Sequence, residues 1–227
     1  MANRTASEAS NDAPVVWDLP TRLFHWLLVL LLVCSFLAVK AGGNWIDWHF
    51  RAGYAILALI VFRIDWGYVG GHHARFRSFL HGPRQVIAYL RGAPDAPGGP
   101  GHNPLGALSV YAMLLLIGAQ AVLGLFSNDD IASEGPLASM VSKSTSDFLT
   151  GLHLRHEPIL LALFALHVLA IAWYRIFRRR RLVGPMITGR DPQAPAGAVS
   201  SRDDARQRLT ALAILVVVAI LVWLVVR

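Results

Sequence analysis

Four histidines in this 227-residue sequence lie in or at the edges of strongly apolar segments. They are His25 in PTRLFHW, His49 in DWHFRAGY, and His153 and His167 in LTGLHLRHEPILLALFALHV. Ionisable side chains are costly to bury among apolar residues, so they are typical of functional sites there. Neutral imidazole is also a common ligand of metal ions. A function is therefore best argued from these four side chains.

The spacing of the histidines predicts two pairs at two depths. His153 and His167 are 14 positions apart, which corresponds to about 21 Å along a helix and about 40° around it. One helix can thus present an imidazole toward each of its ends, opposite His25 and His49 on neighbouring helices. Two such pairs can hold two stacked haem groups, with each iron bound by two imidazoles.

A further histidine on the same segment leaves one ligand open. His156 is 11 positions from His167, about 16.5 Å along a helix and about 20° around it. Spacing therefore does not separate His153 from His156 as the partner of His49. Other functions also accommodate membrane histidines, because a histidine can bond a carbonyl of a neighbouring helix. The alternatives are a histidine relay in a metal or proton transporter and a haem-free membrane scaffold subunit.

Hydropathy places these histidines in membrane-spanning helices. The sequence is 55% hydrophobic and 15% charged, with a mean hydropathy of +0.47. Its apolar residues form blocks close to the roughly 20 residues that cross a bilayer. Five transmembrane helices are predicted, within residues 23–39, 48–69, 105–126, 159–177 and 209–226. The predicted fold class is an all-α membrane protein, with a four-helix transmembrane haem-binding bundle and one extra C-terminal transmembrane helix.

Basic residues predict how the helices are oriented. The formal charge is +7, from 21 Lys and Arg against 14 Asp and Glu. With the N-terminus in the cytoplasm, sixteen of the 21 basic residues lie on the cytoplasmic side. The positive-inside rule therefore predicts a cytoplasmic N-terminus and an external C-terminus. Topology and attraction to anionic lipid account for the positive charge, and no nucleic-acid partner is expected.

Composition shifts divide the sequence into four regions. Residues 1–20 are predicted to form a cytoplasmic N-terminal tail, 21–182 the four-helix domain, 183–207 a flexible cytoplasmic linker, and 208–227 the fifth helix. Between the second and third spans, GPRQVIAYLRG predicts a short interfacial helix that starts at Pro83. Residues 127–150 are predicted to form an outer loop. The single cysteine, Cys34, allows neither an intrachain disulfide nor a CxxCH haem attachment.

Several motifs resemble the bacterial cytochrome b561 and nickel-hydrogenase cytochrome b family. The resemblance covers about Val15 to Gly189, in VVWDLPTRLFHWLL, WHFRAGYAILALIVFRIDWGYVG, GHNPLGAL, GLFSNDD and LTGLH…ALHVLA. It implies a four-helix protein with two b-type haems that passes electrons between quinone and a partner. The resemblance selects His153 over His156. The four implied ligands are identified by their motifs: His25 after PTRLF, His49 before FRAGY, His153 after LTGL, and His167 in ALHV.

The sequence with this resemblance predicts a diheme b-type cytochrome of the respiratory chain in the bacterial cytoplasmic membrane. His25 and His167 are expected to form the inner pair of ligands, and His49 and His153 the outer pair. Four imidazoles saturate both irons, so electron transfer is expected and bond-making chemistry at iron is not. Whether the chain forms part of a quinone-linked oxidoreductase is left open.

Three arginines and several partners complete these expectations. Arg22, Arg51 and Arg63 could contact haem propionates because the guanidinium fork fits a carboxylate. Anchoring at the membrane surface is an equal alternative for them. The expected partners are membrane lipid, the quinone pool, and a periplasmic cytochrome c or a hydrogenase-like redox subunit. A homodimer is left open.

Overall fold

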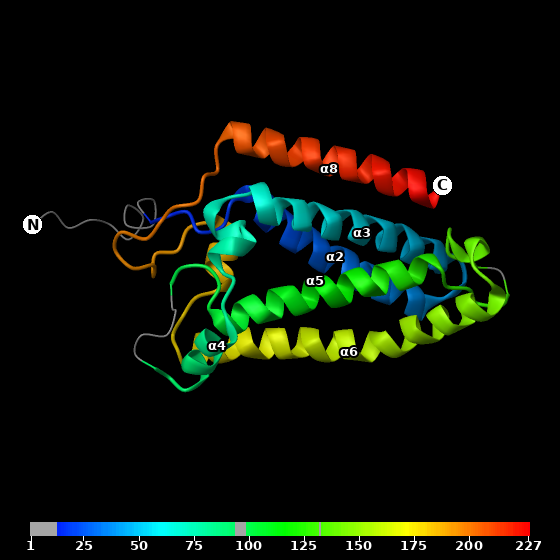
Figure 1. Cartoon of the computed structure of the whole chain (residues 1–227), viewed down its shortest axis with the longest axis horizontal. Coiled ribbons are helices and arrows are strands. Elements are labelled where there is room, and N and C mark those ends of the chain that lie inside the picture. Colours follow the sequence, from blue (N-terminus) through cyan, green and yellow to red (C-terminus); the bar gives the residue numbers. More distant parts are fainter. Residues whose placement is uncertain (1–12, 94–98, 132) are drawn as a thin grey trace, which may run out of the picture. The chain divides into compact units, whose positions relative to one another are not determined.

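The computed structural model describes residues 13–93, 99–131 and 133–227, and Figure 1 shows their helices. Five helices in this part are long and apolar enough to cross a membrane: α2 (Leu19–Ala41), α3 (Ile46–Val69), α5 (Pro104–Leu125), α6 (Lys143–Ile176) and α8 (Ala205–Val226). β-type pairing within the same residues is limited to the isolated bridges Val15–Arg190 and Asn128–Glu134. The predicted all-α membrane fold with five spanning helices is confirmed.

Shorter helices connect the long ones. They are α4 (Pro83–Leu90), α7 (Val183–Thr188) and the 3₁₀ helices η1 (Gly43–Trp45), η2 (His72–Ala74), η3 (Phe76–Ser78) and η4 (Ala138–Met140). α4 confirms the short helix predicted to start at Pro83. The hydroxyl of Tyr89 on α4 lies 2.6 Å from that of Tyr174 on α6, which also accepts a hydrogen bond from Asn103 Nδ2 at 2.8 Å.

α3 is the most buried of the spanning helices although its sequence is the least apolar. Over an 18-residue stretch its mean hydropathy is 1.4, against 2.0 or more for the others, yet 50% of that stretch is buried, against 6–22%. A helix that contacts protein rather than lipid can carry polar residues, because other helices satisfy them. Arg63 is a buried charged residue of this helix, with an exposed fraction of 3%.

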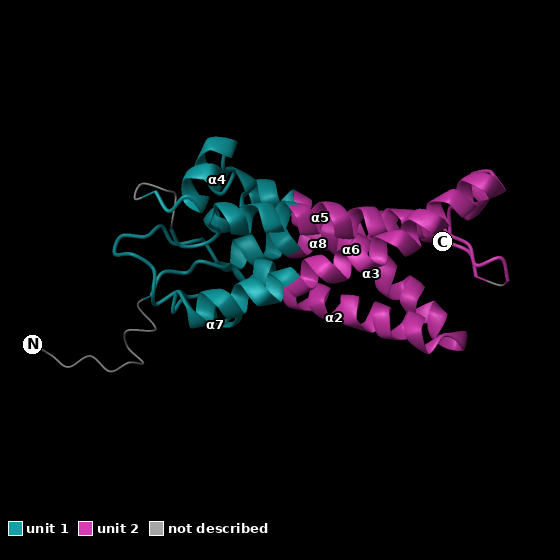
Figure 2. Cartoon of the chain, turned by 90° about the horizontal axis from the view of Figure 1, so that it is seen from below, with its two compact units in different colours: residues 1–23, 65–111, 166–211 teal, residues 24–64, 112–165, 212–227 magenta. Residues whose placement is uncertain are grey.

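The chain forms two compact units, coloured separately in Figure 2. Unit 1 comprises residues 1–23, 65–111 and 166–211, and unit 2 comprises 24–64, 112–165 and 212–227. Each long helix contributes residues to both units. The units therefore differ from the regions predicted from the sequence, which are consecutive stretches of chain.

Asp18 is the polar centre of unit 1, with an exposed fraction of 1%. Its carboxylate accepts hydrogen bonds from the backbone amides of Thr21 at 2.8 Å and Gly71 at 2.9 Å. Both oxygens also accept from Trp66 Nε1, at 3.2 and 3.3 Å. A Cβ atom at Gly71 would lie 2.3 Å from Asp18 Oδ2, so only glycine allows this approach. One carboxylate thus caps the start of α2 and fixes the end of α3.

Residues 183–207, predicted as a flexible linker, pair with the N-terminal residues within unit 1. The segment contains α7 and bonds to the N-terminal residues, which are buried rather than tail-like from residue 13 onward. Gly189 O accepts from Val16 N at 2.8 Å, and Ser201 N donates to Val15 O at 2.7 Å. Polar composition suggested mobility, but backbone pairing with a distant segment fixes the chain here. Residues 1–12 of the predicted tail lie outside the described residues.

The fourth spanning helix begins earlier than predicted. α6 starts at Lys143 and has 34 residues, so the outer loop ends at Ser142 rather than at Thr150. Ser142 caps the helix, because its Oγ accepts from the Thr145 amide at 3.2 Å. Pro158 lies inside α6, and Figure 1 shows the helix changing direction along its length. A proline removes one helical hydrogen bond and commonly produces such a bend.

Replacing Asp18 should loosen unit 1. Asp18→Ala leaves the Trp66 indole and the Gly71 amide buried without their acceptor, and it removes the α2 cap. We expect the free energy of local opening to fall by about 2–4 kcal/mol. The measurement is hydrogen exchange at the Thr21 and Gly71 amides. Asp65→Ala, at an exposed acidic residue of α3, is the control and should leave their protection unchanged. Equal protection in both variants would contradict the role assigned to Asp18.

Candidate functional site

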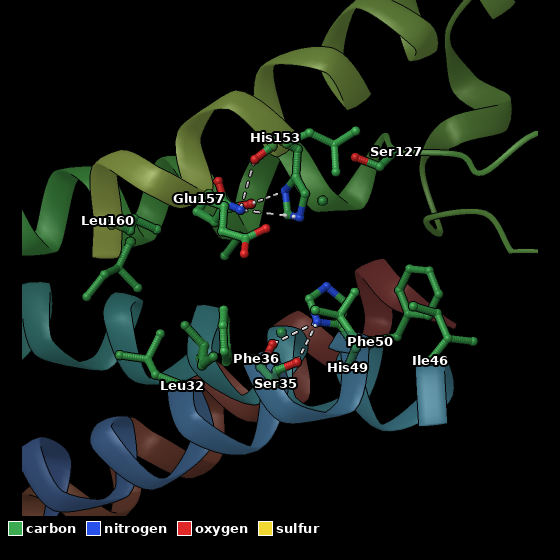
Figure 3. A pocket seen from close by; sticks show the side chains of 18 of the residues that line it. Leu32, Ser35, Phe36, Ile46, His49, Phe50, Ser127, His153, Glu157 and Leu160 are labelled. Atoms are coloured by element: carbon green, nitrogen blue, oxygen red, sulfur yellow. Dashed lines mark hydrogen bonds between the residues drawn. The ribbon is translucent and has the colours of Figure 1, made fainter. Parts of the chain in front are cut away.

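Unit 2 contains a cavity of about 460 Å³ between segments of α2, α3, α5 and α6. This volume is within the range of roughly 300–1,000 Å³ that is usual for small-molecule and cofactor pockets. Most lining residues are apolar, and Leu32, Phe36 and Leu160 are labelled among them in Figure 3. The polar side chains in the lining include His49 and His153, two of the four histidines singled out by the sequence.

His49 on α3 and His153 on α6 face each other across this cavity (Figure 3). Their ring centroids are 6.2 Å apart and the ring planes make an angle of 88°. Two imidazoles that bind one metal from opposite sides, with bonds of about 2 Å, place their ring centres roughly 6 Å apart. The separation of the two rings is therefore that of a pair of axial ligands.

Backbone carbonyls of neighbouring helices orient both rings. His49 Nδ1 lies 3.1 Å from Ser35 O and 2.9 Å from Ser35 Oγ on α2. His153 Nδ1 lies 3.1 Å from Gln120 O on α5. A carbonyl oxygen only accepts, so a proton on each Nδ1 satisfies both carbonyls and leaves a lone pair on each Nε2. Metal-binding histidines are held in this tautomer by the same kind of outer bond.

Gln120 contacts both candidate histidines of α6. Its Nε2 donates to His153 O at 3.1 Å and lies 3.3 Å from His153 Nε2, while its Oε1 lies 3.1 Å from His156 Nδ1. Among the residues described for unit 2, the cavity lining includes His153 and omits His156. Gln120 was missed in the sequence analysis, where its polarity in the apolar stretch LLLIGAQAVLGL was the available signal.

One glycine keeps room for the His153 ring. A Cβ atom at Gly124 would lie 3.2 Å from His153 Cε1, which is tighter than ordinary contact. The glycine therefore allows α5 to approach the imidazole edge closely. Gly53, which also lines the cavity, faces open space, because a Cβ there would meet no atom within 4 Å.

A carboxylate also borders the cavity. Glu157 lies one helical turn after His153 and forms an ion pair with Lys40 Nζ at 2.9 Å. The Lys40 ammonium in turn lies 5.1 Å from the centroid of the Phe36 ring. An ionised carboxylate beside an apolar cavity needs such a partner, because its desolvation is costly. Sequence reasoning gave Glu157 and Lys40 no role.

The other two predicted ligands belong to different units. His25, on α2 in unit 2, is half-buried and packs edge-on against Trp26 with ring centroids 4.9 Å apart. His167, on α6 in unit 1, is also half-buried. Their pairing stays a prediction.

The three arginines predicted to contact propionates have different surroundings. Arg22 donates to Ile187 O at 2.7 Å and lies 3.7 Å from Asp203 Oδ2, within unit 1. Arg51 is exposed and lies over the Trp48 ring at 5.3 Å, as expected of a membrane-surface anchor. Arg63 is buried in α3. Propionate contacts by these residues stay predictions.

Comparison with known proteins gives one family. A sequence model of the prokaryotic cytochrome b561 family matches residues 16–189. Probable Ni/Fe-hydrogenase B-type cytochrome subunits of Azotobacter chroococcum and Azotobacter vinelandii are each 27% identical over 133 residues, 46% of this chain and 54% of theirs. The same-named protein of Bradyrhizobium diazoefficiens is 27% identical over 165 residues, 57% and 64% respectively.

The match spans less than two thirds of the length of each of these relatives. No solved structure matches the chain. The family model nevertheless covers most of the sequence and includes all four predicted ligands. The five apolar helices agree with a multi-pass bacterial membrane protein. The chain therefore belongs to the prokaryotic cytochrome b561 family.

Proposed function

We propose that this protein is a diheme cytochrome b that carries electrons across the bacterial cytoplasmic membrane between quinone and an outer redox partner. The observation that carries the proposal is the facing pair His49 and His153. Both rings are oriented by backbone carbonyls and their centroids are 6.2 Å apart, and His153 Nε2 would bind iron in place of its 3.3 Å contact with Gln120 Nε2. A family match without this pair would have left the cofactor site unassigned.

The residues around the cavity fit a haem group. Haem b supplies a one-electron iron couple when it is bound. His49 and His153 would hold its iron through their Nε2 atoms, one from α3 and one from α6. Ser35 and Gln120 keep the proton on each Nδ1 and so fix the ring orientations. The apolar lining excludes water, so less solvent rearranges when the charge of the site changes.

We assign the second haem to His25 and His167. Support comes from the spacing along α6, where His153 and His167 can serve two levels on one helix. Both side chains are half-buried in membrane-spanning helices. Burying an ionisable imidazole there is costly, so such residues are typical of functional sites. The two haems together would span the distance between the membrane surfaces in two steps.

The proposed partners follow from the relatives and from the charge distribution. The matched proteins of Azotobacter and Bradyrhizobium are named as hydrogenase cytochrome subunits, which supports a hydrogenase-like partner for this chain. A periplasmic cytochrome c is the second candidate. Sixteen of 21 basic residues on one side support a cytoplasmic N-terminus. Quinone would exchange electrons with one of the haems.

A histidine relay for metal or proton transport is less well supported. Such a relay needs hydrated or charged steps along a path, whereas the facing imidazoles border an apolar cavity. Among residues 13–93, 99–131 and 133–227, no group of three or more His, Cys, Asp or Glu is placed to hold a metal ion. Paired imidazoles are the arrangement offered to a metal in unit 2.

The first expected result is a spectrum. The purified full chain, produced with an adequate haem supply, should show a b-type α-band in its reduced-minus-oxidised spectrum. Haem extraction should give about two haems per chain, because two bis-histidine sites are proposed. A folded protein without this band would contradict the diheme assignment and would favour a haem-free scaffold.

The outer ligand is tested by two neighbouring histidines on α6. His153→Ala removes a ring that lines the cavity, so one of two haems should be lost. His156→Ala is the matched control and should retain both, because His156 contacts Gln120 rather than the cavity. The measurement is haem content with the α-band of each variant. Loss of a haem from the His156 variant alone would move the ligand to that residue.

Gln120 should hold His153 in place without being a ligand. Gln120→Leu keeps the backbone carbonyl that accepts from His153 Nδ1 but removes the bond to His153 O. We expect both haems to be present and one to dissociate roughly tenfold faster, which is typical of lost outer-shell contacts. Transfer of haem to apomyoglobin measures this rate. Gln85→Leu, at the start of α4, is the control. An unchanged rate in the Gln120 variant would remove its positioning role.

A further inference from the structure

Unit 1 contains a second cavity, which is polar and has a volume of about 830 Å³. None of the predicted haem ligands is among its lining residues. The end of α6, the helix α7 and the segment after it line this cavity, and α7 is labelled in Figure 2. Asp191 is the one acidic residue among the lining residues. Four arginines also contribute to the lining: Arg175, Arg179, Arg181 and Arg190.

The charges around this cavity are unbalanced. Asp191 is already bound by Arg180, whose guanidinium lies 3.1 Å from Asp191 Oδ2. Arg190 donates to the carbonyl of Ala13 at 2.7 Å, which carries no net charge. Within the described part of the chain, no carboxylate lies within ion-pair distance of the Arg175, Arg179 or Arg181 side chains. Neighbouring guanidinium groups repel each other, so a bound anion would stabilise the arrangement.

The arginine run that follows α6 is held in a fixed shape by Gln193. Gln193 Oε1 accepts from Arg181 N at 2.7 Å, and its Nε2 donates to Arg179 O at 3.0 Å. Its carbonyl accepts from the Arg180 side chain at 2.7 Å. Arg179 adopts a left-handed backbone conformation with φ of 53°, which residues other than glycine rarely do. This turn sends Arg180 to Asp191 while Arg179 and Arg181 line the cavity.

Exposed apolar residues stand among the lining residues or next to them in the sequence. Ile176 lines the cavity at the end of the apolar part of α6. Val183 and Ile187 of α7 are 46% and 60% exposed, and Phe177 is 69% exposed. A soluble inorganic phosphate has no apolar part that could contact these residues. A molecule with a phosphate at one end and hydrocarbon at the other would contact both surfaces.

We propose that this cavity binds the phosphodiester headgroup of an anionic phospholipid. Arg179 and Arg181 form hydrogen bonds to the phosphate oxygens, for which the planar guanidinium is well suited. Arg175 adds positive charge, and the acyl chains lie against Ile176 and Ile187. Basic pockets next to membrane helices bind anionic lipids in the same way. Free inorganic phosphate shares the headgroup chemistry and is the alternative source to be tested.

The test is lipid binding to the purified, haem-loaded full chain in detergent, followed by native mass spectrometry. Wild-type protein should bind phosphatidylglycerol at least about tenfold more tightly than phosphatidylcholine. Arg179→Gln/Arg181→Gln should lower the affinity for phosphatidylglycerol about tenfold, because two charge-assisted contacts are lost. Arg179→Lys/Arg181→Lys keeps the charge without the fork and should give a smaller loss.

A matched control removes the same charge outside the cavity. Arg178 lies over the Trp173 ring, and Arg202 is 70% exposed beside Asp204, so Arg178→Gln/Arg202→Gln should change the affinity less than about twofold. Equal losses in both double variants would overturn the site in favour of general attraction. Displacement of phosphatidylglycerol by millimolar inorganic phosphate would overturn the lipid assignment. If the first double variant fails to fold, Arg175→Gln tests the same cavity with the same predicted direction.

Discussion

The hydrogen bond from an imidazole Nδ1 to a backbone carbonyl of a neighbouring helix is the interaction on which the candidate site depends. It occurs twice in unit 2, from His49 to Ser35 and from His153 to Gln120. Each bond satisfies a polar group that would be costly in an apolar environment. Each also fixes the direction of the other ring nitrogen. Helix packing and ligand chemistry are therefore set by the same contacts, and a shift of α2 or α5 would misdirect a ring.

Burial is distributed to serve this arrangement. α3 carries His49 and the buried Arg63, and it is the helix most covered by protein although its hydropathy is lowest. Hydropathy measures suitability for lipid, whereas a helix inside a bundle needs polar partners instead. The polar residues of α3 thus accompany its high share of buried positions. α6 has the opposite character, since only 6% of an 18-residue stretch of it is buried.

Periodic and local signals of the sequence predicted the five spanning helices and the short helix at Pro83, whereas the choice of His153 over His156 as the partner of His49 came from the family resemblance. Contacts between distant segments could not be predicted in this way. The bonds of residues 189–201 to residues 13–18 depend on backbone atoms that every sequence possesses, so polarity suggested a flexible linker. The start of α6 was missed because the capping role of Ser142 was overlooked. Gln120 was not predicted, because a single polar residue in an apolar helix produces no periodic pattern.

The length of α6 has a consequence for how the protein meets the aqueous phase. Thirty-four residues make a rod of about 51 Å, whereas the hydrocarbon layer is about 30 Å thick. Tilt alone would have to reach roughly 54° to hide the whole helix, beyond the usual limit of about 40°. α6 is therefore longer than the hydrocarbon layer is thick, and part of it extends beyond that layer. Its first turns are hydrogen-bonded to Asn128 through Ser146 and Thr150. The start of α6 and the adjoining loop therefore form one ordered surface at the beginning of the helix that carries His153.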